Sequence, residues 1–224
     1  MIFSDFNRLI AGQPDGVVLL EGRREIPPAD YRLATELARH LATKFPQLRF
    51  RSGNAEGSDQ AFSEGVAQVD AGRLQIVAPY DTHRKNVRYS DALYDSPASM
   101  SKVQEDEVAY KTINATPKNK GLIEKRSTKG RLAAKAVYLI RDTMKVVGHS
   151  EVFTRPLCAL FFVKLEDPME GGTGHTIRVC RQEGMPVVFQ DTWKQWLENK
   201  VEQDAPSNGG LRSCLNSGFH LRRG

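Results

Sequence analysis

The feature that most constrains the fold is the stretch from residue 157 to residue 189, in which a glycine motif separates two apolar runs. Residues 157–163 (LCALFFV) are almost continuously apolar, which is the pattern of a strand buried on both faces. A helical pattern begins at Ile177 and ends before a second apolar run at 187–189. This order of strand, glycine loop, helix and strand predicts a βαβ unit of a parallel sheet.

The glycine motif itself is a candidate ligand site. Glycine lets the backbone approach a ligand closely, and the free amides at a helix start favour an anion such as phosphate. A tight turn that binds no ligand fits the same residues, so support must come from elsewhere in the chain. The candidate ligand-binding residues of this motif are Gly171, Gly172, Thr173, Gly174 and His175.

A second junction of the same kind follows the short strand predicted at 48–51. Its loop is rich in small residues and leads into a helix at 60–69. In a parallel sheet both loops lie at the carboxyl ends of the strands, where ligands bind at the switch in strand order. Asp59 either accepts from a ribose hydroxyl or is a first-turn acid favoured by the helix dipole. The candidate residues here are Ser52, Gly53, Asn54, Ala55, Gly57, Ser58 and Asp59.

A third candidate corner follows the first predicted strand, Val17–Leu20. Gly22, Arg23 and Arg24 come directly after it, either as a phosphate-facing turn or as arginines of a surface loop. One amphipathic helix is predicted after Asp30, with apolar positions from Leu33 to Phe45, and another from Thr128 onward.

Together with a strand at 74–78, these elements predict an α/β fold. We expect a Rossmann-like three-layer sandwich with a mostly parallel sheet of about five strands. Residues 1–200 form one domain, with a helical or irregular insertion at 80–128 and a short helix near 102–113. Residues 201–224 are predicted to be a weakly ordered tail.

Composition and charge narrow the class of protein. The 224 residues are 40% hydrophobic and 26% charged, as in ordinary globular proteins. No apolar run approaches the roughly 20 residues of a membrane helix, and the N-terminus lacks a signal pattern, so we expect a cytoplasmic protein without a membrane partner. The widely spaced Cys158, Cys180 and Cys214 predict free thiols and no metal site.

The formal net charge of +5 is concentrated between Lys118 and Lys135, where seven cations face one acid, Glu124. Such a segment is either a solvated face or a contact for a nucleic-acid backbone. The speculative nucleic-acid contacts are Lys125, Arg126, Lys129 and Arg131. Stacking platforms for bases could come from tyrosines of the insertion, although core or surface roles are the commoner fate of tyrosine. Those tyrosines are Tyr80, Tyr89, Tyr94 and Tyr110.

The order of four segments, Val17–Arg24, Ser52–Asp59, Arg141-Asp142 and Gly171–Gly174, resembles the SLOG superfamily. This Rossmann-like group contains DNA-processing protein A and the Lonely Guy phosphoribohydrolases. The Ser-Gly loop looks like the DNA-processing branch, and the run from Arg141 to Val188 looks like its small relatives from phages and mobile elements. The resemblance implies a nucleotide or phosphate ligand contacted by Arg141. It also implies a DNA-processing or recombination-associated role, with single-stranded DNA as a partner.

Two departures from that pattern bear on function. Glu56 stands where the DNA-processing branch usually has arginine, which makes the loop less favourable to phosphate. Ile177 and Arg178 stand where the hydrolase branch carries its glutamate, so no obvious acid assists N-glycosidic cleavage unless His175 replaces it. We therefore expect a binding protein rather than an enzyme. A phosphoribohydrolase and a nucleotide-signal sensor are the alternatives, and a homodimer is compatible with either.

Overall fold

The computed structural model describes residues 1–204, and it describes the side chains of residues 1–198. Six parallel strands form one sheet in the order β4-β3-β2-β1-β5-β6. The strands are β1 (Val17–Gly22), β2 (Arg49–Gly53), β3 (Leu74–Val77), β4 (Leu93–Asp95), β5 (Cys158–Phe162) and β6 (Val187–Phe189). The order reverses between β1 and β5, which places the ligand-binding crevice of such a fold at their carboxyl ends.

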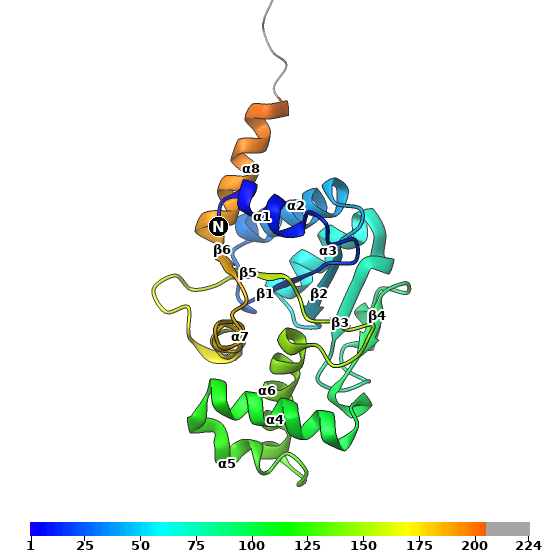
Figure 1. Ribbon diagram of the computed structural model, residues 1–224, viewed down its shortest axis with the longest axis vertical. Helices are drawn as coiled ribbons and strands as arrows, with labels where there is room; N and C mark the ends of the chain where they lie inside the picture. The colour runs from blue at the N-terminus through cyan, green and yellow to red at the C-terminus, as the bar shows by residue number, and fades with distance from the viewer. Residues whose placement is uncertain (205–224) are drawn as a thin grey trace, which may run out of the picture.

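Helices cover both faces of the sheet, so the predicted three-layer α/β fold is confirmed (Figure 1). One face is covered by α1 (Phe3–Ile10), α2 (Pro28–Lys44), α3 (Ser58–Asp70) and α8 (Gln190–Asp204). The other face is covered by α6 (Arg131–Val147) and α7 (Gly171–Gln182). Outside α6 lie α4 (Lys102–Ala115) and α5 (Lys120–Ile123).

Side-chain periodicity explains these layers. In β1, Val18 and Leu20 enter the core under α2, whereas Leu19 enters the core under α7. In α2 the buried residues recur every three or four positions, as predicted, and Pro28 lies in the first turn. The buried stripe of α2 consists of Ala34, Leu37, Ala38, Leu41 and Ala42.

The segment 80–128 contains more regular structure than the sequence predicted. It supplies β4, the sixth strand, in addition to the helix expected near 102–113 and the short α5. Its helices are tied to the sheet-covering layer, because Thr112 Oγ1 donates to Thr143 Oγ1 at 2.7 Å and Lys111 Nζ lies 3.1 Å from Glu183 Oε2. We call α4, α5 and the connecting residues 102–123 the cap.

The chain end and the cysteines also bear on the predictions. Residues 201–204 continue α8, and the rest of the predicted tail, 205–224, lies outside the described residues together with Cys214. Cys158 and Cys180 are buried free thiols, as expected. Within residues 1–204, none of the helices combines the length and the apolar character that crossing a bilayer requires.

Candidate ligand pocket at the switch in strand order

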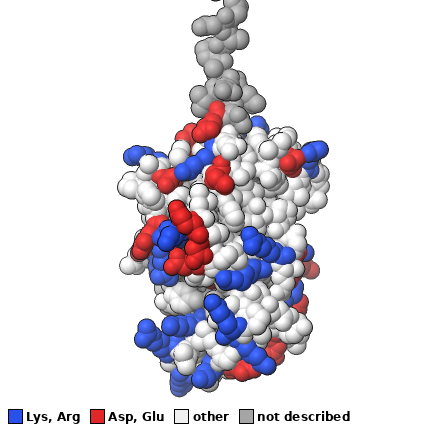
Figure 2. All heavy atoms as spheres, turned by 90° about the vertical axis from the view of Figure 1, so that its left-hand side faces the viewer, with Lys and Arg blue, Asp and Glu red and all other residues white. Residues whose placement is uncertain are grey.

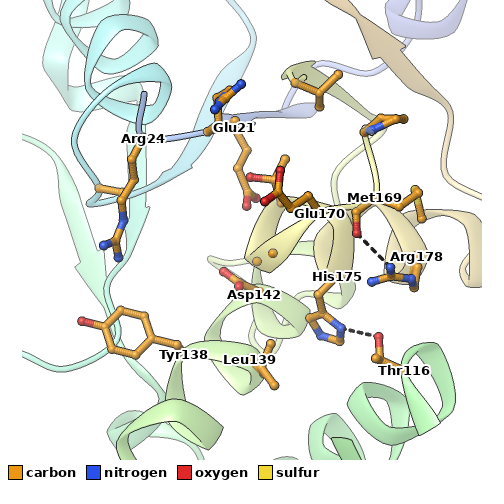
Figure 3. Close-up of a pocket in the computed structure, with 18 of the residues that line it drawn as sticks. Glu21, Arg24, Thr116, Tyr138, Leu139, Asp142, Met169, Glu170, His175 and Arg178 are labelled. Atoms are coloured by element: carbon orange, nitrogen blue, oxygen red, sulfur yellow. Dashed lines mark hydrogen bonds between the residues drawn. The ribbon is translucent and has the colours of Figure 1, made fainter. Parts of the chain in front are cut away.

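A pocket of about 800 Å³ opens at the carboxyl ends of the adjacent strands β1 and β5. The turn after β1, the loop 163–170 with the start of α7, α6, and the cap all contribute to its wall (Figure 3). Ten of the predicted ligand-binding residues line it. They are Gly22, Arg23, Arg24, Ala55, Asp59, Arg141, Gly171, Gly172, Thr173 and His175.

The glycine motif is the first turn of α7 rather than a loop that precedes the helix. The helix begins at Gly171, six residues before the predicted start at Ile177, and the connecting loop is 163–170. Glu170 is the N-cap residue, but its side chain makes no capping hydrogen bond. The amides of the first turn therefore face the pocket without an internal side-chain acceptor.

Packing explains one of the glycines in that turn. A methyl group on Gly174 would collide with the carbonyl of Met169, so only glycine lets the loop close against the helix. Gly174 is buried and does not line the pocket, whereas Gly171 and Gly172 are exposed. Any side-chain carbon on Gly172 would lie 3.2 Å from Asp142 Oδ2, which places this carboxylate beside the helix start.

His175 connects three elements beside the pocket. Its Nδ1 lies 2.8 Å from Thr116 Oγ1 at the end of α4, and its Nε2 lies 3.1 Å from Thr143 Oγ1 on α6. The side chain is buried, and burial lowers the pKa of His175, so the ring is neutral at pH 7. Both ring nitrogens are therefore engaged in holding α7 against α6 and the cap.

The Ser52–Asp59 segment mainly holds the turn after β1. Ser58 Oγ donates to the carbonyl of Arg23 at 2.7 Å, and Gly57, with φ of 79°, lies against the backbone of Arg24. Asn54 Nδ2 donates to the carbonyl of His83 at 2.9 Å. Ser52 and Gly53 belong to β2 and do not line the pocket, and Ser52 Oγ has no hydrogen-bond partner within the described chain.

The two predicted arginines of that turn have different environments. Arg24 is exposed and extends into the space opposite the start of α7 (Figure 3). Arg23 Nη2 lies 3.3 Å from Glu25 Oε2, an exposed carboxylate. Arg24 is therefore the better placed of the two for an anionic ligand.

The floor beside the pocket is a buried charge cluster, consisting of Glu21, Asp59, Arg141, Asp142 and Lys145. Lys145 Nζ lies 2.6 Å from Glu21 Oε2 and 3.1 Å from Asp142 Oδ1, while Arg141 Nε lies 3.2 Å from the same Asp142 oxygen. Asp59 accepts a hydrogen bond from the amide of Gly22 at 3.2 Å. It is thus more than a first-turn acid, because it anchors the turn after β1.

The cluster contains three carboxylates and two cations, and their pKa values diverge accordingly. Burial raises the pKa of Glu21 to about 7, although Lys145 acts against this shift. Burial also raises the pKa of Asp59. Burial opposes ionisation of Asp142 as well, but Arg141 and Lys145 hold its pKa below the ordinary value. Within the described chain, Nη1 of Arg141 is buried and has no hydrogen-bond partner.

Glu21, Asp142 and Lys145 were not among the predicted ligand-binding residues. Asp142 and Lys145 are three residues apart on α6 and therefore share a face, but only the sheet register shows that this face meets Glu21. In the sequence, the usable signal was Glu21 itself, an acid that continues the apolar run of the first strand.

Basic side chains surround the pocket mouth. Lys118 of the cap and Lys135 of α6 line one side of it. Lys164 of the loop before α7 and Arg178 of α7 line the other side. On the face shown in Figure 2, Lys and Arg side chains gather in the lower half, around a hollow that has acidic side chains at one edge. Among the described residues, no group of three or more His, Cys, Asp or Glu side chains is arranged to hold a metal ion.

The four predicted nucleic-acid contacts lie outside the pocket. Lys125, Lys129 and Arg131 are exposed. Arg126 instead points to α4, where it pairs with Glu105 at 2.9 Å and also with Asp106. These pairs neutralise Arg126 in part and hold it away from a ligand.

The fold and its pocket define a Rossmann-like α/β protein with a ligand crevice at the switch in strand order. No family model and no curated protein matches the chain. One solved structure, of DNA processing protein A from Helicobacter pylori in a study of its single-stranded DNA binding mode, matches with a TM-score of 0.43 and 13% identity. The match covers 87% of this chain and 76% of that chain. At this level, the similarity carries no functional information about the present protein.

Proposed function

We propose that the switch-point pocket binds the phosphate of a nucleotide or of a single-stranded nucleic acid, in a DNA-processing role. The observation that carries the proposal is the pairing of two anion-binding features across one pocket. The uncapped first turn of α7 lies on one wall, and the guanidinium of Arg24 extends from the opposite wall. Helix-start amides and arginine are both strong partners for phosphate oxygens.

The acids of the pocket favour a nucleotide over a simple anion. Asp142 and Glu170 line the same space and can only accept hydrogen bonds when ionised. An inorganic anion that has no hydrogen-bond donor is repelled by them. A nucleotide supplies sugar hydroxyls and base amines as donors, in addition to a phosphate for the amides and for Arg24. The mixed polarity of the wall therefore matches a nucleotide unit.

Arg24→Ala tests the proposal because Arg24 is exposed and its loss leaves the fold intact. Isothermal titration calorimetry with deoxynucleoside monophosphates and with short single-stranded DNA should show binding by the wild type. In the variant the affinity should fall by about 10- to 150-fold, since a charge-assisted hydrogen bond contributes roughly 1.5–3 kcal/mol. Arg8→Ala, an exposed arginine of α1 far from the pocket, is the matched control. Unchanged binding by Arg24→Ala would contradict the proposal.

A second candidate function, N-glycosidic hydrolysis of a nucleoside monophosphate, is favoured by one observation. Asp142 places a carboxylate beside the start of α7. It could supply the acid that is missing at Ile177 and Arg178, the positions where the hydrolase branch carries its glutamate. Release of free base from nucleoside monophosphates, measured by chromatography, would support it if Asp142→Asn abolished the release. Binding without any base release excludes this second candidate and leaves the binding function.

A further inference from the structure

An aromatic and basic patch adjoins the pocket on the side of the β3 carboxyl end. We define the Tyr80 patch as Tyr80, His83, Arg84 and Arg88 of the loop after β3, together with Tyr138 of α6. The His83 ring packs edge-on against Tyr80 at 5.3 Å and against Tyr138 at 6.4 Å, as measured between ring centroids. Tyr138 lines the pocket, so the three rings lead from the pocket wall to the outer surface.

Tyr80 is the accessible end of this group. Its side chain is 48% exposed, unlike the buried rings of the core. Burial raises the pKa of Tyr138, and the neighbouring Tyr80 side chain raises it further. A large ring that is half exposed beside a polar pocket offers a face on which a planar group can stack.

The surroundings of these rings are strongly cationic. Burial lowers the pKa of His83, and the charges of Arg141, Arg84, Arg24 and Arg88 lower it further. Four guanidinium groups therefore act on one imidazole, which stays neutral at pH 7. Arg24 and Arg141 also line the pocket, so arginine side chains lie both at the pocket wall and near His83.

The loop that carries the patch is held in place by the neighbouring strand end. Asn54 fixes the carbonyl of His83, and Arg84 donates to Gln60 Oε1 at 3.1 Å. Arg84 has φ of 45°, and among the described residues it is the only one other than glycine with a positive φ. Such a conformation persists only where its surroundings enforce it, so the patch is preformed.

We propose that Tyr80 stacks a base of a single-stranded nucleic acid whose neighbouring phosphate occupies the switch-point pocket. The inference rests on the proposed function and narrows it, because the ligand is then an oligonucleotide and not a mononucleotide. Aromatic rings with arginines beside them can contact the bases and the phosphates of one strand. An acidic peptide would use the arginines but would leave the exposed ring face without a planar partner.

The length dependence of binding tests this inference. Unlabelled dTMP and dT6 compete with a 3′-labelled dT6 in fluorescence anisotropy with the wild type. We expect dT6 to bind about 5- to 150-fold more tightly than dTMP, the gain that corresponds to 1–3 kcal/mol of stacking per base. In Tyr80→Ala the ratio of the two affinities should fall by the factor that stacking contributes, and in Tyr80→Phe it should stay near the wild-type value because the ring remains.

Tyr110→Ala is the matched control, since Tyr110 is 66% exposed on α4 and does not line the pocket. It should keep the wild-type ratio. If dTMP binds but dT6 binds no better, or if Tyr80→Ala keeps the wild-type ratio, the inference fails while the proposed function stands. If neither ligand binds the wild type, the proposed function fails and the inference fails with it. Tighter competition by an oligoglutamate peptide than by dT6 would also overturn the inference.

Discussion

At the scale of single residues, the unusual feature is a cluster of buried charges beside a polar pocket. Burying an ion is costly unless it is paired, and Lys145 is fully buried between Glu21 and Asp142. The surplus carboxylate is accommodated because burial raises the pKa of Glu21 to about 7. Glu21 therefore exchanges a proton near neutral pH, at the edge of the candidate site.

Glu21→Gln should change the pH dependence of stability. Folding raises the pKa of Glu21 from about 4.5 in the unfolded chain to about 7. The contribution of Glu21 to the free energy of unfolding is therefore fully present below pH 4.5 and is lost as the pH rises through about 7. Glutamine imitates the protonated form at every pH. Relative to the wild type, the variant should therefore gain at most about 3 kcal/mol between pH 4.5 and pH 8. Urea unfolding of both proteins across this range measures the difference, and a difference that is constant with pH would contradict the assignment.

The sequence predicted part of the residue-scale site for a physical reason. Arg24 lies just after β1, and Gly171 and Gly172 begin the helix that follows β5. Because the carboxyl ends of neighbouring parallel strands lie at one edge of the sheet, the order of the segments predicted that these residues meet. Glu21 and Lys145 are 124 positions apart in the chain and meet only through the packing of α6 on β1. No local pattern encodes such a pair, which is why it was missed.

At the scale of elements, α7 links the sheet, α6 and the cap. His175 of α7 contacts Thr116 at the end of α4 and Thr143 of α6, so this one residue connects α4, α6 and α7. The predicted glycine loop proved to be the first turn of α7, since its helix-breaking composition is offset by the close packing of Gly174 on Met169. The strand β4 was not predicted within the insertion, because Leu93–Asp95 is only three residues long and shows no recognisable hydrophobic alternation.

Thr116→Val should loosen the cap. The change preserves shape but leaves Nδ1 of the buried His175 without its partner, which costs roughly 1–3 kcal/mol. Hydrogen exchange in residues 102–123 should accelerate more than exchange in the sheet, because the lost contact joins the cap to α7. Thr43→Val, which removes only an exposed hydrogen bond within α2, should leave both regions unchanged. Equal acceleration throughout the chain would show that His175 stabilises the whole fold rather than the docking of the cap.

At the scale of the whole molecule, the strand order concentrates ligand-binding features at one edge. The pocket lies at the reversal between β1 and β5, where the cap adds Lys118 and α6 adds Lys135 to its mouth. Lys125 and Lys129 continue the basic surface away from the pocket. The predicted fold class required only hydrophobic periods and glycine positions, whereas this distribution of charge depends on how the cap packs on α6.

The geometry predicts two classes of lysine, which salt dependence can separate. Each contact with a single-stranded phosphate contributes about 0.7 to the slope of log affinity against log salt. Lys118→Ala/Lys135→Ala should therefore lower the slope by roughly 1.4 for both a hexanucleotide and a 20-nucleotide strand, because these lysines border the pocket. Lys125→Ala/Lys129→Ala should lower the slope only for the longer strand, since a short ligand held in the pocket does not extend to them.

The matched control for both pairs is Arg32→Ala/Arg39→Ala, which removes two exposed charges from α2 on the opposite face of the sheet. It alters net charge by the same amount and should leave the slope unchanged for either strand. A uniform fall in slope for all three double variants would indicate that binding responds to net charge alone. A fall confined to Lys125→Ala/Lys129→Ala would move the nucleic-acid path from the pocket to the outer surface of the cap.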